Sequence, residues 1–236
     1  LSACSIESRL SFDGGTSVWF ALRSQSRAAE AIKAGVFVDE IIPVHVPQRR
    51  NNPLLVDSDE HPRATTIEKL RELPTPFREG GSVTAGNSSG VNDGAAALIL
   101  ATKSGIKRHA LTPMARITGG ATAGVSPRIM GIGPTSATEK LCAQLCTEPR
   151  NFDLIELNEA FASQALAVLR QFGLADDAEH VNPNGGAIAL GHPLGMSGAR
   201  ITGTAARMLA KGYGKTALAT MCIGVGQGIA IGLEAV

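Results

Sequence analysis

Three turns in the second half of the chain carry side chains suited to carbonyl chemistry. Asn158 follows the apolar run at 154–157, His192 stands between a glycine and a proline in a long loop, and Cys222 precedes a glycine-rich turn. Amide and imidazole groups can donate hydrogen bonds to an oxyanion, and a thiol can move a proton. Because each turn lies at the end of a predicted strand, we expect the three side chains on adjoining strand ends.

Each of these residues also has a structural interpretation. Asn158 is suited to cap the helix that follows it, and Ser197 is expected to be the N-cap of a later helix. His192 could be a structural histidine, and Cys222 could be a buried free thiol beside a hairpin. The glycine pattern at 224–228 is a weak dinucleotide signal. Strand-like residues follow it where a helix would be required, so we set nucleotide binding aside.

Short apolar runs alternate with segments of helical periodicity, which favours an α/β fold with a sheet covered by helices. The first eighty residues predict a helix that ends at Gly35, a strand at 40–46 and a short helix at 66–73. The buried side of that first helix would consist of Phe20, Ala28, Ala31 and Ile32. Later strands are predicted at 96–101, 115–120, 153–157, 215–221 and 228–234, and later helices at 135–146, 159–172 and 197–211.

The composition is that of a globular protein with a core. The chain has 236 residues, of which 44% are hydrophobic and 18% charged, and its formal net charge is +1. This near-balance argues against a nucleic-acid or anionic-membrane surface. The apolar tract 217–233 is too short and too interrupted to span a membrane, and it is interpreted as two buried strands around a glycine turn.

The four cysteines suggest neither a zinc site nor a disulfide scaffold. We expect free thiols in a reducing compartment, with Cys142 and Cys146 on one buried helix face. The chain opens with Leu1, and its first methionine is Met114. Because residues 1–11 do not have the pattern of a signal peptide, we interpret the sequence as a fragment that lacks its natural N-terminus.

Four segments resemble the signatures of the thiolase family. They are the central motif at 81–96, the Asn-Glu-Ala-Phe turn at 158–161, the Gly-His-Pro segment at 191–200 and the Cys-Ile-Gly turn at 222–226. The resemblance covers about residues 20–236. It implies an α/β thiolase fold of which the chain holds the C-terminal half, a mixed sheet covered by helices, plus the loop region. Most of the N-terminal half-domain would be missing.

This resemblance implies a division into three parts. Residues 1–81 would form a partial loop domain with an atypical lead-in at 1–19, residues 82–105 the last elements of the N-terminal domain, and residues 106–236 the C-terminal domain. The segments 59–66, 182–186 and 191–196 are most similar to those of thiolases that act on 3-oxoadipyl-CoA in aromatic degradation. Thiolases that act on acetoacetyl-CoA share most of these segments, so that alternative stays open.

The family's chemistry implies roles for the three turns. A nucleophilic cysteine takes an acyl group from a 3-oxoacyl-CoA, releasing acetyl-CoA, and then passes it to free CoA. His192 would activate the nucleophile and help bind a thioester oxygen, and Asn158 would hold the water that completes this oxyanion site. Cys222 would protonate the leaving enolate, and Gly224 would offer a backbone N–H to a second oxyanion hole. A thiol can be tuned to titrate near neutral pH for such a task.

The resemblance also implies that CoA binds as a substrate and that no cofactor is bound permanently. Arg63 would contact the adenine nucleotide, and the remaining contacts would come from Phe77, Ala85, Ser89 and Gly90 along the pantetheine and from Ala160 and Phe161 near the thiol. We expect no metal, no nucleic acid and no membrane partner. The family further implies a cytoplasmic homodimer or homotetramer.

One family feature has no counterpart in this sequence. The nucleophile of the family lies in an N-terminal motif Asn-x-x-Cys-x-Ser-Gly, and Cys4 lies in a different context, so the role is not carried onto it. We therefore expect the chain to be inactive alone. A non-catalytic CoA-binding protein is the alternative from a different functional class. Loss of a packed half-domain would also expose an apolar face.

Overall fold

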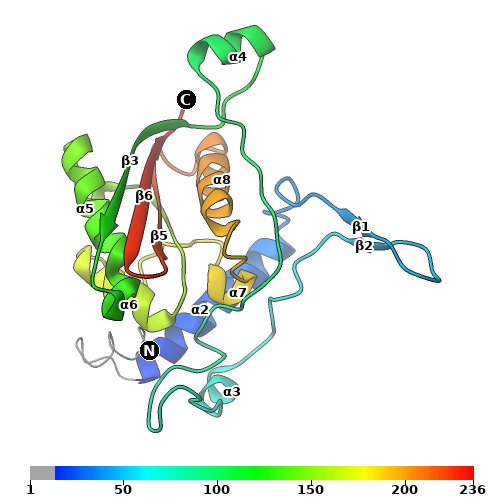
Figure 1. The fold of residues 1–236 in the computed structure, drawn as a ribbon, viewed down its shortest axis with the longest axis vertical. Coiled ribbons are helices and arrows are strands. Elements are labelled where there is room, and N and C mark those ends of the chain that lie inside the picture. Colours follow the sequence, from blue (N-terminus) through cyan, green and yellow to red (C-terminus); the bar gives the residue numbers. More distant parts are fainter. Residues whose placement is uncertain (1–13) are drawn as a thin grey trace.

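The computed structural model describes residues 14–236, and its centre is a four-stranded mixed sheet (Figure 1). The strand order is β3-β6-β5-β4, with β5 antiparallel to β6, β6 antiparallel to β3 and β4 parallel to β5. The bounds are β3 (Arg116–Gly124), β4 (Leu154–Leu157), β5 (Thr216–Ile223) and β6 (Gln227–Glu234). This arrangement confirms the predicted mixed sheet and the two strands around a glycine turn in the tract 217–233.

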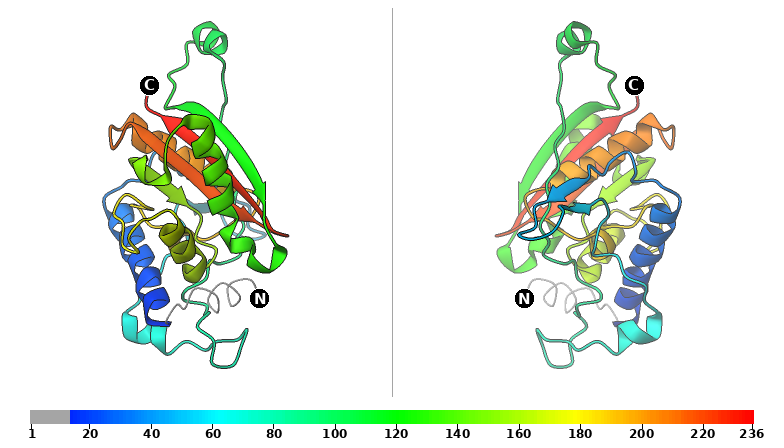
Figure 2. Two further views of the ribbon diagram at one scale, coloured as in Figure 1. Left: turned by 90° about the vertical axis from the view of Figure 1, so that its left-hand side faces the viewer. Right: turned by 90° about the vertical axis from the view of Figure 1, so that its right-hand side faces the viewer.

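Helices cover both faces of the sheet. α5 (Gly133–Leu145) packs on β3 and β6, and α8 (Ser197–Ala210) packs on β5 and β4. α5 faces the viewer in the left view of Figure 2, and the right view shows the opposite side of the sheet. The alternation of side chains along a strand explains the two layers. Leu154 packs with the α8 side, whereas its neighbour Ile155 belongs to the larger core on the other side.

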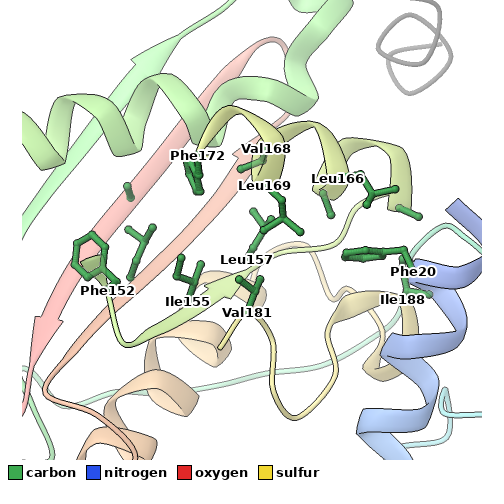
Figure 3. Packing of buried hydrophobic residues seen from close by; sticks show 14 of the residues in the cluster. Phe20, Phe152, Ile155, Leu157, Leu166, Val168, Leu169, Phe172, Val181 and Ile188 are labelled. Atoms are coloured by element: carbon green, nitrogen blue, oxygen red, sulfur yellow. The ribbon is translucent and has the colours of Figure 1, made fainter. Parts of the chain in front are cut away.

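The larger core gathers around α6 (Ala162–Gln171), whose residues 162–169 are all buried. Figure 3 shows Leu166 and Leu169 of this helix with Leu157 of β4, and Phe20 enters the same cluster from the first helix. The cluster therefore joins the beginning of the chain to the segment that follows β4. Three short helices of the second half of the chain are η1 (Pro127–Ile132), η2 (Pro149–Asn151) and α7 (Ala187–Leu190).

The first helix, α2 (Gly14–Lys33), packs against α6 and α7. Phe20, Ala28 and Ala31 are buried as predicted, but the prediction for Ile32 is wrong, because its side chain is 48% exposed. Gly35, at φ +70°, ends the helix: its N–H donates to the carbonyl of Ile32, and the next N–H donates to that of Ala31. Glycine is favoured at this left-handed position because it has no Cβ.

The segment after α2 forms a small hairpin away from the sheet. β1 (Val44–Val46) pairs antiparallel with β2 (Leu54–Val56), so only the end of the predicted strand 40–46 is a strand. α3 (Ile67–Arg71) follows, and the hydroxyl of Thr66 caps it, in agreement with the predicted helix at 66–73. Among residues 14–236, no helix is both long and apolar enough to cross a membrane.

The predicted strand at 96–101 is wrong. These residues form neither strand nor helix, and Ile99 and Leu100 are 86% and 75% exposed. Their apolar sequence is that of a strand, but within the described part of the chain no strand pairs with them. α4 (Lys103–His109) comes next, has no buried residue, and stands apart from the sheet in Figure 1.

The two cysteines of the helix at 133–145 differ from the prediction in one respect. Cys142 is buried in the core, but Cys146 is the left-handed C-cap residue, at φ 51°, and is exposed. The prediction from the i, i+4 spacing is wrong for Cys146, because the helix ends at Leu145 and Cys146 lies beyond its buried face. Cys142, Cys146 and Cys222 are free thiols, and Cys4 lies outside the described residues.

Candidate active site

Asn158 is held at the carboxyl end of β4. Its backbone N–H donates to the carbonyl of Thr220 at 3.0 Å, which extends the parallel ladder between β4 and β5 by one residue. Its side chain is completely buried. The helix-cap interpretation is wrong, since α6 begins at Ala162 with Phe161 at the N-cap position. The side chain of Asn158 therefore does not cap α6.

His192 lies beside Asn158 and is 8% exposed. Its Nε2 is 3.4 Å from Nδ2 of Asn158, and its Nδ1 is 2.6 Å from Oγ of Ser197. The backbone N–H of His192 donates to Oδ1 of Asn92 at 3.1 Å. Burial, followed by the charge of Arg200, lowers the pKa of the imidazole. The residue is thus held through both ring nitrogens and its backbone N–H, and burial favours the neutral form of the ring.

Ser197 does not cap α8 as predicted. The N-cap position belongs to Met196, and Ser197 is the first residue inside the helix, with its hydroxyl on His192. The side chain also donates to the carbonyl of Pro193 at 3.1 Å. Sequence reasoning chose Ser197 for the right reason, a polar side chain at a helix start, but the hydroxyl serves the imidazole instead.

Cys222 lies near the end of β5, opposite Gly228 of β6, and is 5% exposed. Burial raises the pKa of its thiol to about 11, which favours the protonated thiol near neutral pH. A protonated thiol is the form that an acid requires. Gly224 follows in the exposed turn between β5 and β6. Asn158 and Cys222 are thus placed at the ends of neighbouring strands.

The central motif docks on this strand end. The N–H and Oγ of Ser89 lie 3.0 and 3.3 Å from the carbonyl of Ala160, and Ser88 forms an antiparallel bridge with Phe161. Val91 forms a parallel bridge with His192. Four of the predicted CoA contacts therefore come together at one place, namely Ser89, Gly90, Ala160 and Phe161.

The other three predicted CoA contacts lie elsewhere. Arg63 lines a groove of about 430 Å³ between α2 and the segment 62–65, and a smaller cavity of about 150 Å³ that reaches Gly86. Ala85 is exposed beside that cavity, and Phe77 is 60% exposed and lines neither space.

Sequence reasoning missed the buried carboxylate of Glu159. It accepts hydrogen bonds from Ser24 Oγ at 2.7 Å, Asn182 Nδ2 at 2.8 Å and the N–H of Ile188 at 3.2 Å. A carboxylate that is taken out of water needs such donors. The signal was present, since Glu159 is an acidic residue between two segments of buried character.

A second buried carboxylate, Glu156, lies on β4 two residues before Asn158 and is 2% exposed. Its Oε2 is 3.9 Å from Nη1 of Arg200 on α8. Burial raises the pKa of Glu156 to about 8, and the charge of Arg200 opposes that rise. Glu156 was also missed. No three histidine, cysteine, aspartate or glutamate side chains among residues 14–236 are grouped so as to hold a metal ion.

Comparison with known protein families identifies the family of this chain. The pattern "Thiolase, C-terminal domain" matches residues 111–235, and "Thiolase, N-terminal domain" matches residues 16–104. The chain belongs to the thiolase family. The resemblance drawn from the four motifs is therefore confirmed, as is the α/β thiolase fold.

Thiolases from several bacteria are similar over most of the chain. The "Beta-ketoadipyl-CoA thiolase" of Pseudomonas aeruginosa is 59% identical over 218 residues, or 92% of this chain and 54% of that protein. The "3-oxoadipyl-CoA/3-oxo-5,6-dehydrosuberyl-CoA thiolase" of Escherichia coli is 56% identical over the same shares. The "Acetyl-CoA acetyltransferase" of P. aeruginosa is 52% identical over 91% of this chain and 54% of that protein. The chain spans about half the length of these thiolases.

Solved thiolase structures share the fold over the whole chain. The acetyl-CoA acetyltransferase of Bacillus anthracis gives a TM-score of 0.95 at 42% identity and covers 100% of this chain and 59% of that one. The human mitochondrial 3-ketoacyl-CoA thiolase in complex with CoA gives 0.93 at 43% identity, with 100% and 58% covered. These names describe the acyltransferase chemistry of the relatives.

Proposed function

We propose that this chain supplies part of the active site of a CoA-dependent acyltransferase of the thiolase type. The reaction cleaves a 3-oxoacyl-CoA with CoA to acetyl-CoA and a shortened acyl-CoA, or runs as the reverse condensation. The observation that carries the proposal is the meeting of Asn158 and His192 at the end of β4, with the segment at 88–91 bridged onto the same place.

The proposed roles follow from the atoms that each residue offers. His192, kept neutral by burial, has a ring nitrogen that can take the proton of a nucleophilic thiol. Asn158 offers its amide beside that nitrogen and can hold a water at the thioester oxygen. Cys222 is held in the thiol form and can protonate an enolate, and the exposed turn that holds Gly224 gives its backbone N–H access to a second oxygen.

The proposed substrate is 3-oxoadipyl-CoA, as in aromatic degradation. Support comes from the 53–59% identity to β-ketoadipyl-CoA thiolases, against 52% for the acetyl-CoA acetyltransferase. We further propose that the protein acts in the cytoplasm as a homodimer or homotetramer, as the family implies. The free thiols at Cys142, Cys146 and Cys222 suit a reducing compartment.

CoA binding tests the first step of this proposal. Titration calorimetry of the 236-residue chain with CoA should show binding that Ser89→Tyr weakens at least about tenfold, because the larger side chain fills the space beside Ala160. Ser104→Tyr, on the exposed helix α4, is the matched control and should bind like the unchanged chain. Equal binding by the two variants would contradict the proposed path of the pantetheine.

Turnover tests the chemistry. The chain alone should not cleave 3-oxoadipyl-CoA. A chimera with the upstream half of the P. aeruginosa β-ketoadipyl-CoA thiolase should cleave it. His192→Ala in the chimera should lower the turnover number by about 10²-fold or more. A Cys222→Ser chimera with full activity would refute the role of that thiol. A preference of the chimera for acetoacetyl-CoA over 3-oxoadipyl-CoA would contradict the proposed substrate. CoA binding without turnover would favour a non-catalytic protein.

A further inference from the structure

His192 stands in a chain of polar contacts that ends on a backbone carbonyl. Nε2 faces Nδ2 of Asn158 at 3.4 Å, Nδ1 faces Oγ of Ser197 at 2.6 Å, and that Oγ lies 3.1 Å from the carbonyl oxygen of Pro193. A neutral imidazole carries one proton, on Nδ1 or on Nε2, and its partners decide which. The contacts around His192 can therefore be counted for each form.

With the proton on Nδ1, three hydrogen bonds form in sequence. Nδ1–H donates to Oγ of Ser197, the hydroxyl donates to the carbonyl of Pro193, and the amide of Asn158 donates to the lone pair of Nε2. Among the described residues, one buried atom of this group stays without a partner, namely Oδ1 of Asn158. An under-satisfied carbonyl oxygen is the less costly kind of buried orphan.

With the proton on Nε2, only two hydrogen bonds form. The amide of Asn158 must turn over so that its oxygen accepts from Nε2–H, and the hydroxyl of Ser197 must turn to Nδ1 and away from Pro193. The amide NH₂ of Asn158, completely buried, then replaces its oxygen as the group without a partner. Orphaned N–H groups are rarer in protein interiors than orphaned carbonyl oxygens.

The carbonyl oxygen of Pro193 accepts hydrogen bonds from several donors. It also accepts the backbone N–H groups of Met196 at 2.9 Å and Ser197 at 3.0 Å, so the hydroxyl is its third and longest donor. The short Nδ1–Oγ distance requires one hydrogen between these two atoms in either form. The form with three bonds is favoured because it alone gives the Ser197 hydroxyl both a donor and an acceptor.

We propose that Ser197 is a positioning residue that holds the proton of neutral His192 on Nδ1 and leaves the lone pair of Nε2 beside Asn158. The hydroxyl accepts a hydrogen bond from the imidazole and donates one to the carbonyl of Pro193, which lies just before α8. A base that takes the proton of a thiol through Nε2 needs this tautomer. The catalytic role of this tautomer rests on the proposed function, whereas the tautomer of His192 does not.

Nuclear magnetic resonance of the ¹⁵N-labelled chain tests the proposal directly. Long-range ¹H–¹⁵N correlations distinguish protonated from unprotonated ring nitrogens, and the loss of one set in His192→Gln identifies this residue among the five histidines. At a pH above the pKa of His192, Nδ1 should be the protonated nitrogen. Ser197→Ala should shift the ratio of the two tautomers toward Nε2–H by about tenfold, the effect of one net hydrogen bond.

Ser197→Thr keeps the hydroxyl and should keep the Nδ1–H form, which a purely packing role for Ser197 would not require. An imidazole protonated on Nε2 in the unchanged chain would overturn the proposal, and so would an unchanged ratio in Ser197→Ala. Should Ser197→Ala fail to fold, the unchanged chain and Ser197→Thr still decide. CoA binding is measured separately, so a wrong tautomer and a wrong function give different results.

Discussion

The hydroxyl of Ser24 donates to the carboxylate of Glu159 at 2.7 Å and joins two residues that are 135 positions apart in the chain. The same hydroxyl accepts the N–H of Gly186 at 3.0 Å. One side chain of α2 thereby connects the Asn-Glu-Ala-Phe turn with the glycine turn before α7. The position of the Asn158 turn consequently depends on a helix near the beginning of the chain.

Ser24→Ala is expected to destabilise the fold by about 1–3 kcal/mol, because it removes a buried hydrogen bond to a charged group and leaves one donor of Gly186 unpaired. The free energy of unfolding in urea measures this effect. Ser26→Ala, an exposed position on the same helix, is the control and should change stability by less than about 0.5 kcal/mol. Equal effects at the two positions would contradict the role of the Ser24–Glu159 bond.

Gly186→Ala is expected to be destabilising by about 1–3 kcal/mol or more, the usual cost of overpacking. A Cβ at this position would overlap the carboxylate of Glu159, which is held by its three donors. A Cβ at Gly195 would meet no atom within 4 Å, so Gly195→Ala is the matched control. Thermal unfolding of the two variants compares them, and a stable Gly186→Ala protein would show that the Glu159 carboxylate can move.

Glu156 should make stability depend on pH. Burial raises its pKa from 4.5 to about 8 in the folded chain, so the folded state keeps a proton that the unfolded state loses. The wild-type chain therefore loses stability between about pH 4.5 and about pH 8, relative to Glu156→Gln, which does not ionise. Above about pH 8, the free energy of unfolding of Glu156→Gln relative to wild type should be higher by the order of a few kcal/mol than it is below about pH 4.5.

Urea unfolding of the chain and of Glu156→Gln at about pH 5 and about pH 9 measures this gain. Ser26→Ala, at an exposed position of α2, removes no ionisable group and is the control, so its effect on stability should be the same at both pH values. A difference between wild type and Glu156→Gln that does not change with pH would mean that Glu156 is ionised in the folded chain, paired with Arg200.

The rates of alkylation should distinguish Cys146 from Cys222. A pKa of about 11 leaves Cys222 with about a hundredfold less thiolate near neutral pH than an ordinary thiol with a pKa of 9.0. Iodoacetamide at about pH 8 should modify the exposed Cys146 first and Cys222 only slowly, as read by mass spectrometry of peptides. In urea the two rates should become similar. Rapid labelling of Cys222 in the folded chain would show that its thiol is neither buried nor protonated.

Much of the sheet could be predicted from the sequence, because the strands at 153–157, 215–221 and 228–234 are apolar runs between clear turns. The residue types at three turns indicated Asn158, His192 and Cys222, and the thiolase motifs contain all three residues. Local patterns could not assign partners, however. Ser197 was expected to serve its helix and instead serves His192, and Glu159 gave no sign that its donors come from distant positions.

The errors at Ile32 and at 96–101 have a common physical cause. Periodicity identifies residues that favour burial but does not say whether a neighbouring surface exists to cover them. Ile32 lies on the α2 side that borders the groove, and the segment 96–101 has the composition of a strand without a strand beside it among residues 14–236.

The exposed run of seven residues at 95–101 also bears on how the protein behaves at high concentration. Ala95, Ala96, Ala97, Leu98, Ile99, Leu100 and Ala101 contain no charge, proline or glycine, and the backbone is not paired in a sheet. Segments of this kind template intermolecular β-pairing, which grows with concentration and which a single lysine can suppress. The same residues that favour a strand inside a sheet thus make this surface the expected starting point of aggregation, and Ile99 is its most exposed large side chain.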